Sequence, residues 1–289
     1  MWLPLILIST TLQGLSLVFA KQSNKLNGAK TTAIFWLFWY HLITILIIIA
    51  IRPEYIINFS IRDLLIMLPI IIVQTLGFIF TIKALEYAAA SIVTPIQRVS
   101  VVITIILGVL VLKEHVTLMQ LIISAILLFL VIWLSRTVNT DSKNKNLRLG
   151  LIYTFLSVPM AGTLVVMYKI YIDYFGDPFY VILYTSISAF IGLVIYLVFK
   201  KEWKFIGIKR VDAKWALILA MLLDLFSAIT HRFSLITGNV SVIAVITTAS
   251  LGVTLLASRI YLKEKLSLKQ YLIIGGIFIS IVILALFKL

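Results

Sequence analysis

Residues 91–114 read SIVTPIQRVSVVITIILGVLVLKE, and residues 241–264 read SVIAVITTASLGVTLLASRIYLKE. The two stretches are 150 residues apart, and each is a long apolar run that begins with serine and ends with Leu-Lys-Glu. Polar positions agree at the same shift: Ser100 with Ser250, Thr104 with Thr254 and Gln120 with Gln270. A slightly smaller shift pairs Gly14 with Gly162 and Lys21 with Lys169. The pattern indicates an internal duplication.

The apolar runs are too long and too numerous for a water-soluble domain. Of the 289 residues, 62% are hydrophobic and 12% are charged, against about half and a quarter in soluble domains. Ten runs are long enough to span about 30 Å of hydrocarbon, and they do not alternate in polarity as barrel strands do. We therefore expect ten transmembrane helices, at 2–20, 32–51, 62–84, 89–112, 117–135, 148–171, 178–200, 213–236, 240–262 and 267–287.

A polar linker at 136–148 divides these helices into two sets of five. We expect one repeat at 1–138 and a second at 146–289. Because each repeat has an odd number of spans, the second must lie upside down relative to the first. The expected fold is an all-α membrane protein with two inverted five-helix repeats. Inverted repeats are typical of secondary transporters, whose substrate site lies near the bilayer midplane. A duplication that only builds a scaffold is the alternative.

Composition and motifs exclude several other classes of protein. The net charge of +14 comes from short basic clusters between the apolar runs, so we expect a lipid bilayer and a small molecule as partners, and no nucleic acid. There are no cysteines, and no dinucleotide, phosphate-loop or zinc-peptidase motif occurs. We therefore expect no enzyme, no cofactor and no metal. Transport would be facilitated or coupled to an ion gradient, with protons as one candidate.

The chain resembles the EamA family of the drug/metabolite transporter superfamily. The resemblance rests on small residues that open the fourth and ninth helices, as in Ala88-Ala89-Ala90-Ser91 and Val240-Ser241, and on Glu114 and Glu264 just after them. It implies a transporter in the cell (cytoplasmic or inner) membrane, with a cavity lined mainly by helices 3, 4, 8 and 9. It also implies that helices 5 and 10 support the outside. Family members export amino acids, other metabolites or drugs.

Asp224 is the only acid deep in an expected span, and the 150-residue shift matches it with Gln74, also mid-span. A charge at that depth is costly and is usually functional, although a packing hydrogen bond is the alternative. Arg98 follows Gln97 in the fourth helix, and its matched position holds Thr248, beside Thr247. Arg98 and Asp224 should differ in depth by roughly 5 Å, which suits the two charges of an amino acid. A buried ion pair, or an arginine that reaches the interface, would explain them equally.

Further candidate substrate-binding residues are His41, Tyr40, Tyr184 and His231. Mid-span histidines could relay protons or simply form packing hydrogen bonds. Aromatic faces could hold a cation or face lipid. Trp36 and Tyr180 lie near span ends, so we expect them to contact lipid. Glu114 and Glu264 are expected to fix turn geometry.

The sequence therefore predicts a secondary transporter that exports a small polar metabolite, such as an amino acid, by alternating access. The alternative cargo is an organic cation or drug held by Asp224 and aromatic rings. Less favoured alternatives are an intramembrane enzyme and a lipid flippase. The loops after helices 1, 5, 7 and 9 hold fifteen Lys and Arg residues, against five on the other side. This charge bias places both termini outside, whereas the family is usually drawn with both termini inside.

Overall fold

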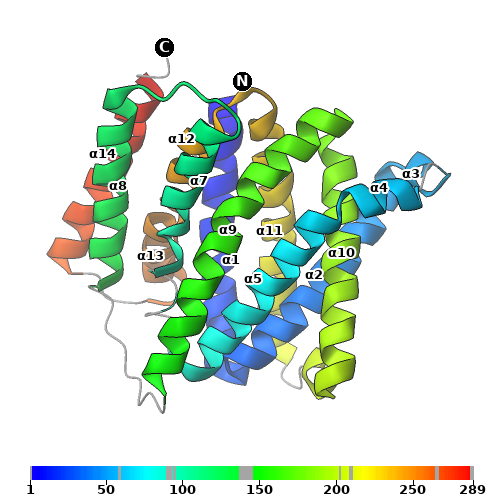
Figure 1. Cartoon of the computed structure of the whole chain (residues 1–289). Helices are drawn as coiled ribbons and strands as arrows, with labels where there is room; N and C mark the ends of the chain where they lie inside the picture. The colour runs from blue at the N-terminus through cyan, green and yellow to red at the C-terminus, as the bar shows by residue number, and fades with distance from the viewer. Residues whose placement is uncertain are drawn as a thin grey trace.

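The computed structural model is all-helical over the residues it describes, which are 2–57, 60–88, 93, 96–136, 146–201, 203–207, 211–263 and 267–286. The long helices run up and down in one bundle (Figure 1). The elements are α1 (Trp2–Asn27), α2 (Ala29–Ile51), α3 (Glu54–Ile57), α4 (Ile61–Ile66), α5 (Leu68–Tyr87), α7 (Ser100–Leu110), α8 (Leu118–Arg136), α9 (Leu147–Phe175), α10 (Pro178–Lys200), η1 (Trp203–Ile206), α11 (Val211–Thr237), α12 (Val240–Thr247), α13 (Ser250–Tyr261) and α14 (Leu268–Leu286).

Seven spans in the described part of the chain are long and apolar enough to cross a membrane. They are Trp2–Ser23, Thr31–Ile51, Leu68–Tyr87, Leu147–Phe175, Pro178–Lys200, Lys214–Thr237 and Val240–Tyr261. Three shorter apolar helices, Ser100–Leu110, Leu118–Leu134 and Leu268–Ile283, coincide with parts of the other expected spans. The all-helical membrane architecture is confirmed, and the count of ten spans stays a prediction.

Three of the expected helices are interrupted in the described part of the chain. The run expected at 62–84 begins as α4 and continues as α5, because Pro69 lacks an N–H and its ring clashes with the carbonyl four residues back. The run expected at 240–262 is α12 and α13, separated by a turn at Thr248 and Ala249. There the Thr248 hydroxyl donates to the Val245 carbonyl oxygen at 2.6 Å, in competition with the regular helical bonds.

The fourth helix is interrupted at the matching place. Arg98 and Val99 form a turn just before α7, 150 residues before the turn at Thr248 and Ala249. Residues 89–92, 94 and Pro95 of this expected span lie outside the described residues. Each half of the chain therefore has a discontinuous helix with its break at the same position, a device that secondary transporters use to place main-chain polar groups at a binding site.

The two halves interlock. In the first half α1 packs along α11 of the second, and α9 of the second half packs along α5 of the first. Thus the first helix of each half lies on the third helix of the other. The pair α8 and α14 pack on each other at the left edge of the bundle, beside α7, α12 and α13 (Figure 1).

Matched small residues let these helices approach closely. A Cβ atom on Gly14 would lie 2.6 Å from Val253 Cβ, and one on Gly162 would lie 2.6 Å from Ile103 Cβ. The Thr254 hydroxyl donates to the Gly14 carbonyl oxygen, and the Thr104 hydroxyl donates to the Gly162 carbonyl oxygen, both at 3.0 Å. Close backbone approach and interhelical hydrogen bonds are the forces that hold helices together in lipid.

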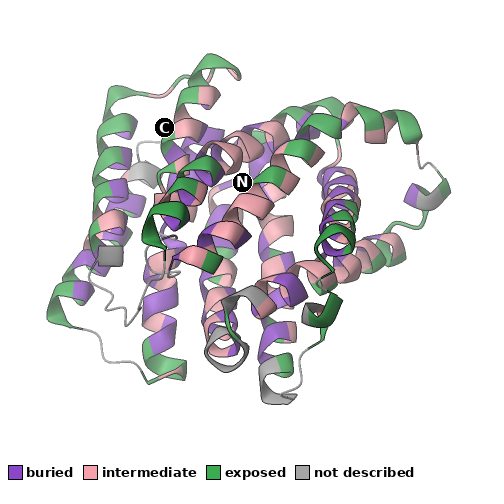
Figure 2. Ribbon diagram, turned by 60° about the horizontal axis from the view of Figure 1, so that its bottom comes forward, coloured by how far each residue is buried: buried purple, intermediate pink, exposed green. Residues whose placement is uncertain are grey.

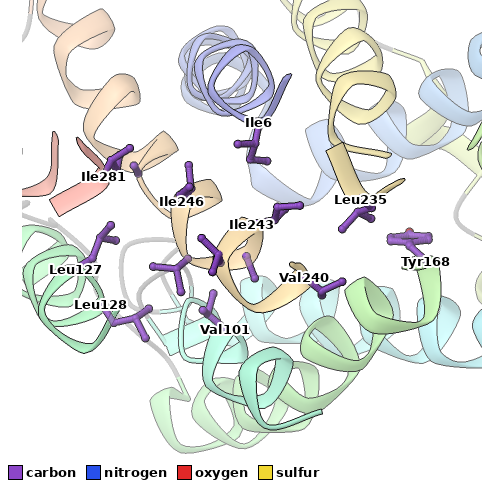
Figure 3. Packing of buried hydrophobic residues seen from close by; sticks show 14 of the residues in the cluster. Ile6, Val101, Leu127, Leu128, Tyr168, Leu235, Val240, Ile243, Ile246 and Ile281 are labelled. Atoms are coloured by element: carbon purple, nitrogen blue, oxygen red, sulfur yellow. The ribbon is translucent and has the colours of Figure 1, made fainter. Parts of the chain in front are cut away.

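Apolar side chains pack together at the end of the bundle where α1 begins, hereafter the N-terminal side. Trp2 and Ile6 of α1, Ile172 near the end of α9 and Leu235 near the end of α11 belong to one buried cluster with α12. Figure 3 shows Ile6, Leu235, Val240 and Ile243 in this cluster. Outward helix faces are largely exposed and inward faces are buried (Figure 2), as a lipid-facing bundle requires.

Candidate functional site

A cavity of about 440 Å³ lies where the two helix breaks meet. This polar cavity is lined by residues from both breaks, together with α1, α9 and α11. Its polar lining residues are Gln13, Thr81, Gln97, Arg98, Ser100, Thr104, His231, Thr247 and Thr248. The structure thus brings together four of the predicted site residues, Gln97, Arg98, Thr247 and His231.

A second cavity of about 390 Å³ adjoins the first and shares Leu17, Thr81 and Ala161 with it. Most of its lining is apolar: Val73, Phe78, Met160 and Leu164 belong to it, and Gln74 and Ser157 add polar groups. This apolar cavity extends toward the side opposite the N-terminal side, because Ala20 near the end of α1 and Leu85 near the end of α5 also line it. A small pocket of about 30 Å³ shares Gln74 with it and contains His41.

Arg98 carries a charge for which the described residues offer little compensation. Its Nη2 donates to the Ser250 hydroxyl at 3.4 Å, and it forms no ion pair with any described carboxylate. A guanidinium at membrane depth is costly unless it is paired. Its planar fork of donors matches a carboxylate, so the polar cavity is suited to an anionic group.

The neighbouring Gln97 has a positioning role. Its Nε2 donates to Thr81 Oγ1 at 2.8 Å and to Ser157 Oγ at 3.1 Å, which ties the helix break to α5 and α9. By contrast, Gln13 Oε1, Gln74 Oε1 and His41 Nδ1 are buried without a hydrogen-bond partner in the described part of the chain. Buried polar atoms of this kind normally have a protein, water or ligand partner.

Asp224 lies apart from Arg98. It is not among the lining residues of these three cavities. Tyr40 on α2 packs at the edge of a buried cluster of Phe35, Leu217 and Met221 and does not line these cavities either. The described residues form no direct Arg98–Asp224 ion pair, and the expectation that these two side chains bind opposite ends of one amino acid stays a prediction.

Tyr184 does not line the three cavities either. It is fully buried at the N-terminal side, where its hydroxyl accepts hydrogen bonds from the Ser60 N–H and the Tyr180 hydroxyl, both at 3.0 Å. Nearby, the Tyr55 hydroxyl donates to Asp177, and burial raises the pKa of that phenol. These tyrosines hold the α3–α4 segment on α10, so Tyr184 has a structural position.

Trp36 and Gln13 are among the cavity residues that were not foreseen from the sequence. Trp36 lines the apolar cavity, although its position near a span end had suggested lipid contact. Gln13 lines the polar cavity, and its position beside Gly14, which matches Gly162 in the second half, is the signal that could have revealed it.

Comparison with known proteins agrees with this architecture. The model of the EamA-like transporter family matches residues 1–137 and 148–286. The chain belongs to the EamA-like transporter family. This EamA protein is therefore a multi-pass membrane protein of the drug/metabolite transporter type. It shares its fold with a solved structure titled "Crystal structure of protein", at a TM-score of 0.77 and 12% identity, over 98% of this chain and 97% of the other. No curated protein matches it.

Proposed function

We propose that this EamA protein is a secondary transporter that exports a small carboxylate-bearing metabolite, with an amino acid as the first candidate. The proposal rests on Arg98, which lines a cavity between two broken helices. The described residues do not compensate the charge of its side chain. A ligand carboxylate would supply the missing anion through paired, charge-assisted hydrogen bonds.

The rest of the ligand would occupy the polar and apolar cavities together. Gln13 and Thr247 can hydrogen-bond an amino or hydroxyl group, since both line the polar cavity with Arg98. The apolar cavity next to Ala161 offers Trp36, Phe78 and other apolar side chains for a hydrophobic portion. This arrangement favours metabolites with one charged and one apolar end.

The interlocked halves support transport by alternating access. Apolar side chains around Ile6 and Leu235 are packed together at the N-terminal side, while the apolar cavity extends toward the opposite side. Because the halves make matched contacts, an exchange of their conformations would close the second side and open the first. The organic-cation alternative is less well supported, because its anchor Asp224 is not among the residues that line these cavities.

Counterflow into proteoliposomes tests this function. Vesicles preloaded with one unlabelled amino acid or organic acid should take up the same labelled compound if it is a substrate. Arg98→Lys should reduce that uptake at least about tenfold, because loss of a charge-assisted hydrogen bond costs about 1.5–3 kcal/mol. Arg259→Lys, at an exposed site on α13, is the matched control. Absence of counterflow across the panel, or a fully active Arg98→Lys, would refute the proposal.

A further inference from the structure

The small pocket that contains His41, hereafter the recess, lies between α2, α5 and α10, and its volume is about 30 Å³. It shares Leu37, Gln74 and Phe78 with the apolar cavity, so it lies directly beside that cavity. A water molecule needs roughly 10–15 Å³ of such space. The recess therefore has room for one water molecule or one hydroxyl group.

Three polar atoms from the lining of the recess are buried without a hydrogen-bond partner among the described residues. They are Gln74 Oε1, Thr75 Oγ1 and His41 Nδ1. Buried polar atoms normally have a protein, water or ligand partner. Thr75 lacks even the bond to the carbonyl oxygen four residues before it, which the Thr154 hydroxyl forms in α9. All three atoms are therefore available to a bound group.

The position of the Thr75 hydroxyl depends on a glycine in α10. A Cβ atom on Gly192 would lie 2.5 Å from Thr75 Oγ1 and 3.0 Å from Thr75 Cγ2. Ala189 and Leu193 of the same helix line the recess, so a side chain at position 192 would displace Thr75 from its wall. The close approach of α10 thus keeps the Thr75 hydroxyl beside Gln74.

The chemistry of the three atoms fits an uncharged hydroxyl group. Gln74 Oε1 only accepts hydrogen bonds, Thr75 Oγ1 donates or accepts, and His41 Nδ1 does either according to its tautomer. A hydroxyl group donates one hydrogen bond and accepts two, so it can satisfy all three atoms. None of the described residues that line the recess is Asp, Glu, Lys or Arg. A charged group would therefore be buried there without a counterion, which is costly.

The recess lies at a distance from Arg98 along α5. Gln97, next to Arg98, donates to Thr81 on α5, and Gln74 is seven residues before Thr81. Seven residues make two helical turns, so Gln74 and Thr81 share one face of α5 and lie roughly 10 Å apart along it. Both residues line the apolar cavity. A ligand whose carboxylate binds Arg98 therefore reaches the recess only with the far end of its apolar portion.

We propose that the recess is a specificity site of this transporter and binds a hydroxyl group at the far end of the ligand. The preferred ligand is then a carboxylic or amino acid whose apolar portion ends in a hydroxyl group. Gln74 accepts the hydroxyl hydrogen, and Thr75 and His41 donate to its oxygen. A ligand without the hydroxyl leaves these buried atoms unpaired and binds more weakly for that reason. The inference rests on the proposed function, because it takes the ligand carboxylate to lie at Arg98.

Two pairs of ligands test the recess in the purified protein. Tyrosine and phenylalanine differ by a hydroxyl group at the far end, whereas threonine has its hydroxyl close to the carboxylate and valine has none. Thermal stabilisation at increasing concentration gives the affinity for each compound. The parent should prefer tyrosine to phenylalanine at least about fivefold, since phenylalanine leaves buried polar atoms unpaired. Threonine should gain no such preference over valine, because its hydroxyl cannot reach the recess from Arg98.

Gln74→Leu and Thr75→Val each remove one polar atom of the recess with little change in shape. Each should reduce the preference for tyrosine over phenylalanine at least about twofold. Thr11→Val, at an exposed position of α1, is the matched control for Thr75→Val and should keep the preference. Arg98→Lys should weaken the binding of both compounds and leave their ratio unchanged, because both carry the carboxylate.

Equal affinities of the parent for tyrosine and phenylalanine would overturn the inference and would show that the recess holds a structural water only. So would a preference that both Gln74→Leu and Thr75→Val retain, or a parent that binds threonine and valine but neither of the longer compounds. Failure of the proposed function would appear differently, as a parent that shows neither counterflow nor stabilisation with any acid in the panel.

Discussion

The Glu114 carboxylate of the first half accepts a hydrogen bond of 2.6 Å from the Ser241 hydroxyl of the second half. The same carboxylate accepts the main-chain N–H groups of Ser241, at 3.1 Å, and of Val240. It therefore caps the N-terminus of α12, where unpaired N–H groups and the helix dipole favour an anion. A Cβ atom on Gly108 would collide with both side chains of this contact and would displace at least one of them. This agrees with the expectation that Glu114 has a structural role. Glu264, its counterpart, lies outside the described residues.

Loss of this cap should destabilise the protein. Glu114→Ala should lower the free energy of unfolding by roughly 1.5–3 kcal/mol, because it leaves buried donors without a charged acceptor. Thermal unfolding in detergent, followed by circular dichroism, measures the change. Glu54→Ala removes an exposed glutamate paired with Arg52 and should leave the melting temperature nearly unchanged. Equal melting temperatures for the two variants would contradict the capping role.

Gly14→Ala should also destabilise, because its Cβ would lie 2.9 Å from the Ser250 carbonyl oxygen, on a neighbouring backbone that cannot move freely. Overpacking of this kind costs about 1–3 kcal/mol. Gly275→Ala is the matched control in α14, where a Cβ would meet nothing within 4 Å and helix propensity favours alanine. The measurement is the melting temperature of each variant. A Gly14→Ala protein as stable as Gly275→Ala would show that the α1–α13 approach is looser than described.

Repetition in the sequence carried more information than individual polar residues did. Gly14, Gly162, Thr104 and Thr254 were matched by shift alone, and they form matching contacts between the halves. The break at Thr248 and Ala249 could not be predicted, since neither proline nor glycine occurs there and hydroxyl competition for a carbonyl leaves no sequence signature. Asp224 and Arg98 were placed at similar depth, but depth does not specify which face of a helix a residue occupies in the bundle. Tyr184 was a candidate substrate-binding residue, but it lies outside the three cavities. Spacing along a helix does not distinguish a tyrosine that packs inside the bundle from one that lines a cavity.

Ala161 lies where the polar and apolar cavities join, so a large side chain there should block the ligand. Ala161→Trp should abolish counterflow while the protein remains monodisperse in gel filtration. Leu156→Trp, on an exposed face of the same helix α9, should transport normally. If Ala161→Trp transported at the parent rate, the two cavities could not form one substrate site.

Orientation can be measured directly because the chain has no cysteine. The bias of fifteen basic residues against five predicts that the side opposite the N-terminal side is cytoplasmic. A single cysteine replacing Gly207, exposed after η1, should then resist a membrane-impermeant maleimide in intact cells. A single cysteine replacing His115, exposed between α7 and α8, should react. The reverse labelling pattern would place both termini inside.

Binding of matched ligand pairs tests most directly whether Arg98 binds a carboxylate. The pair is the amino acid with the largest counterflow and its carboxamide, which has nearly the same shape but no carboxylate. Each is added to the purified protein, and the rise in melting temperature reports affinity and concentration. We predict that the acid stabilises the parent protein, and that the amide needs an at least about tenfold higher concentration to give the same rise in melting temperature. Arg98→Gln should respond to neither compound. Equal stabilisation by acid and amide, or a response to the acid that persists in Arg98→Gln, would contradict the account.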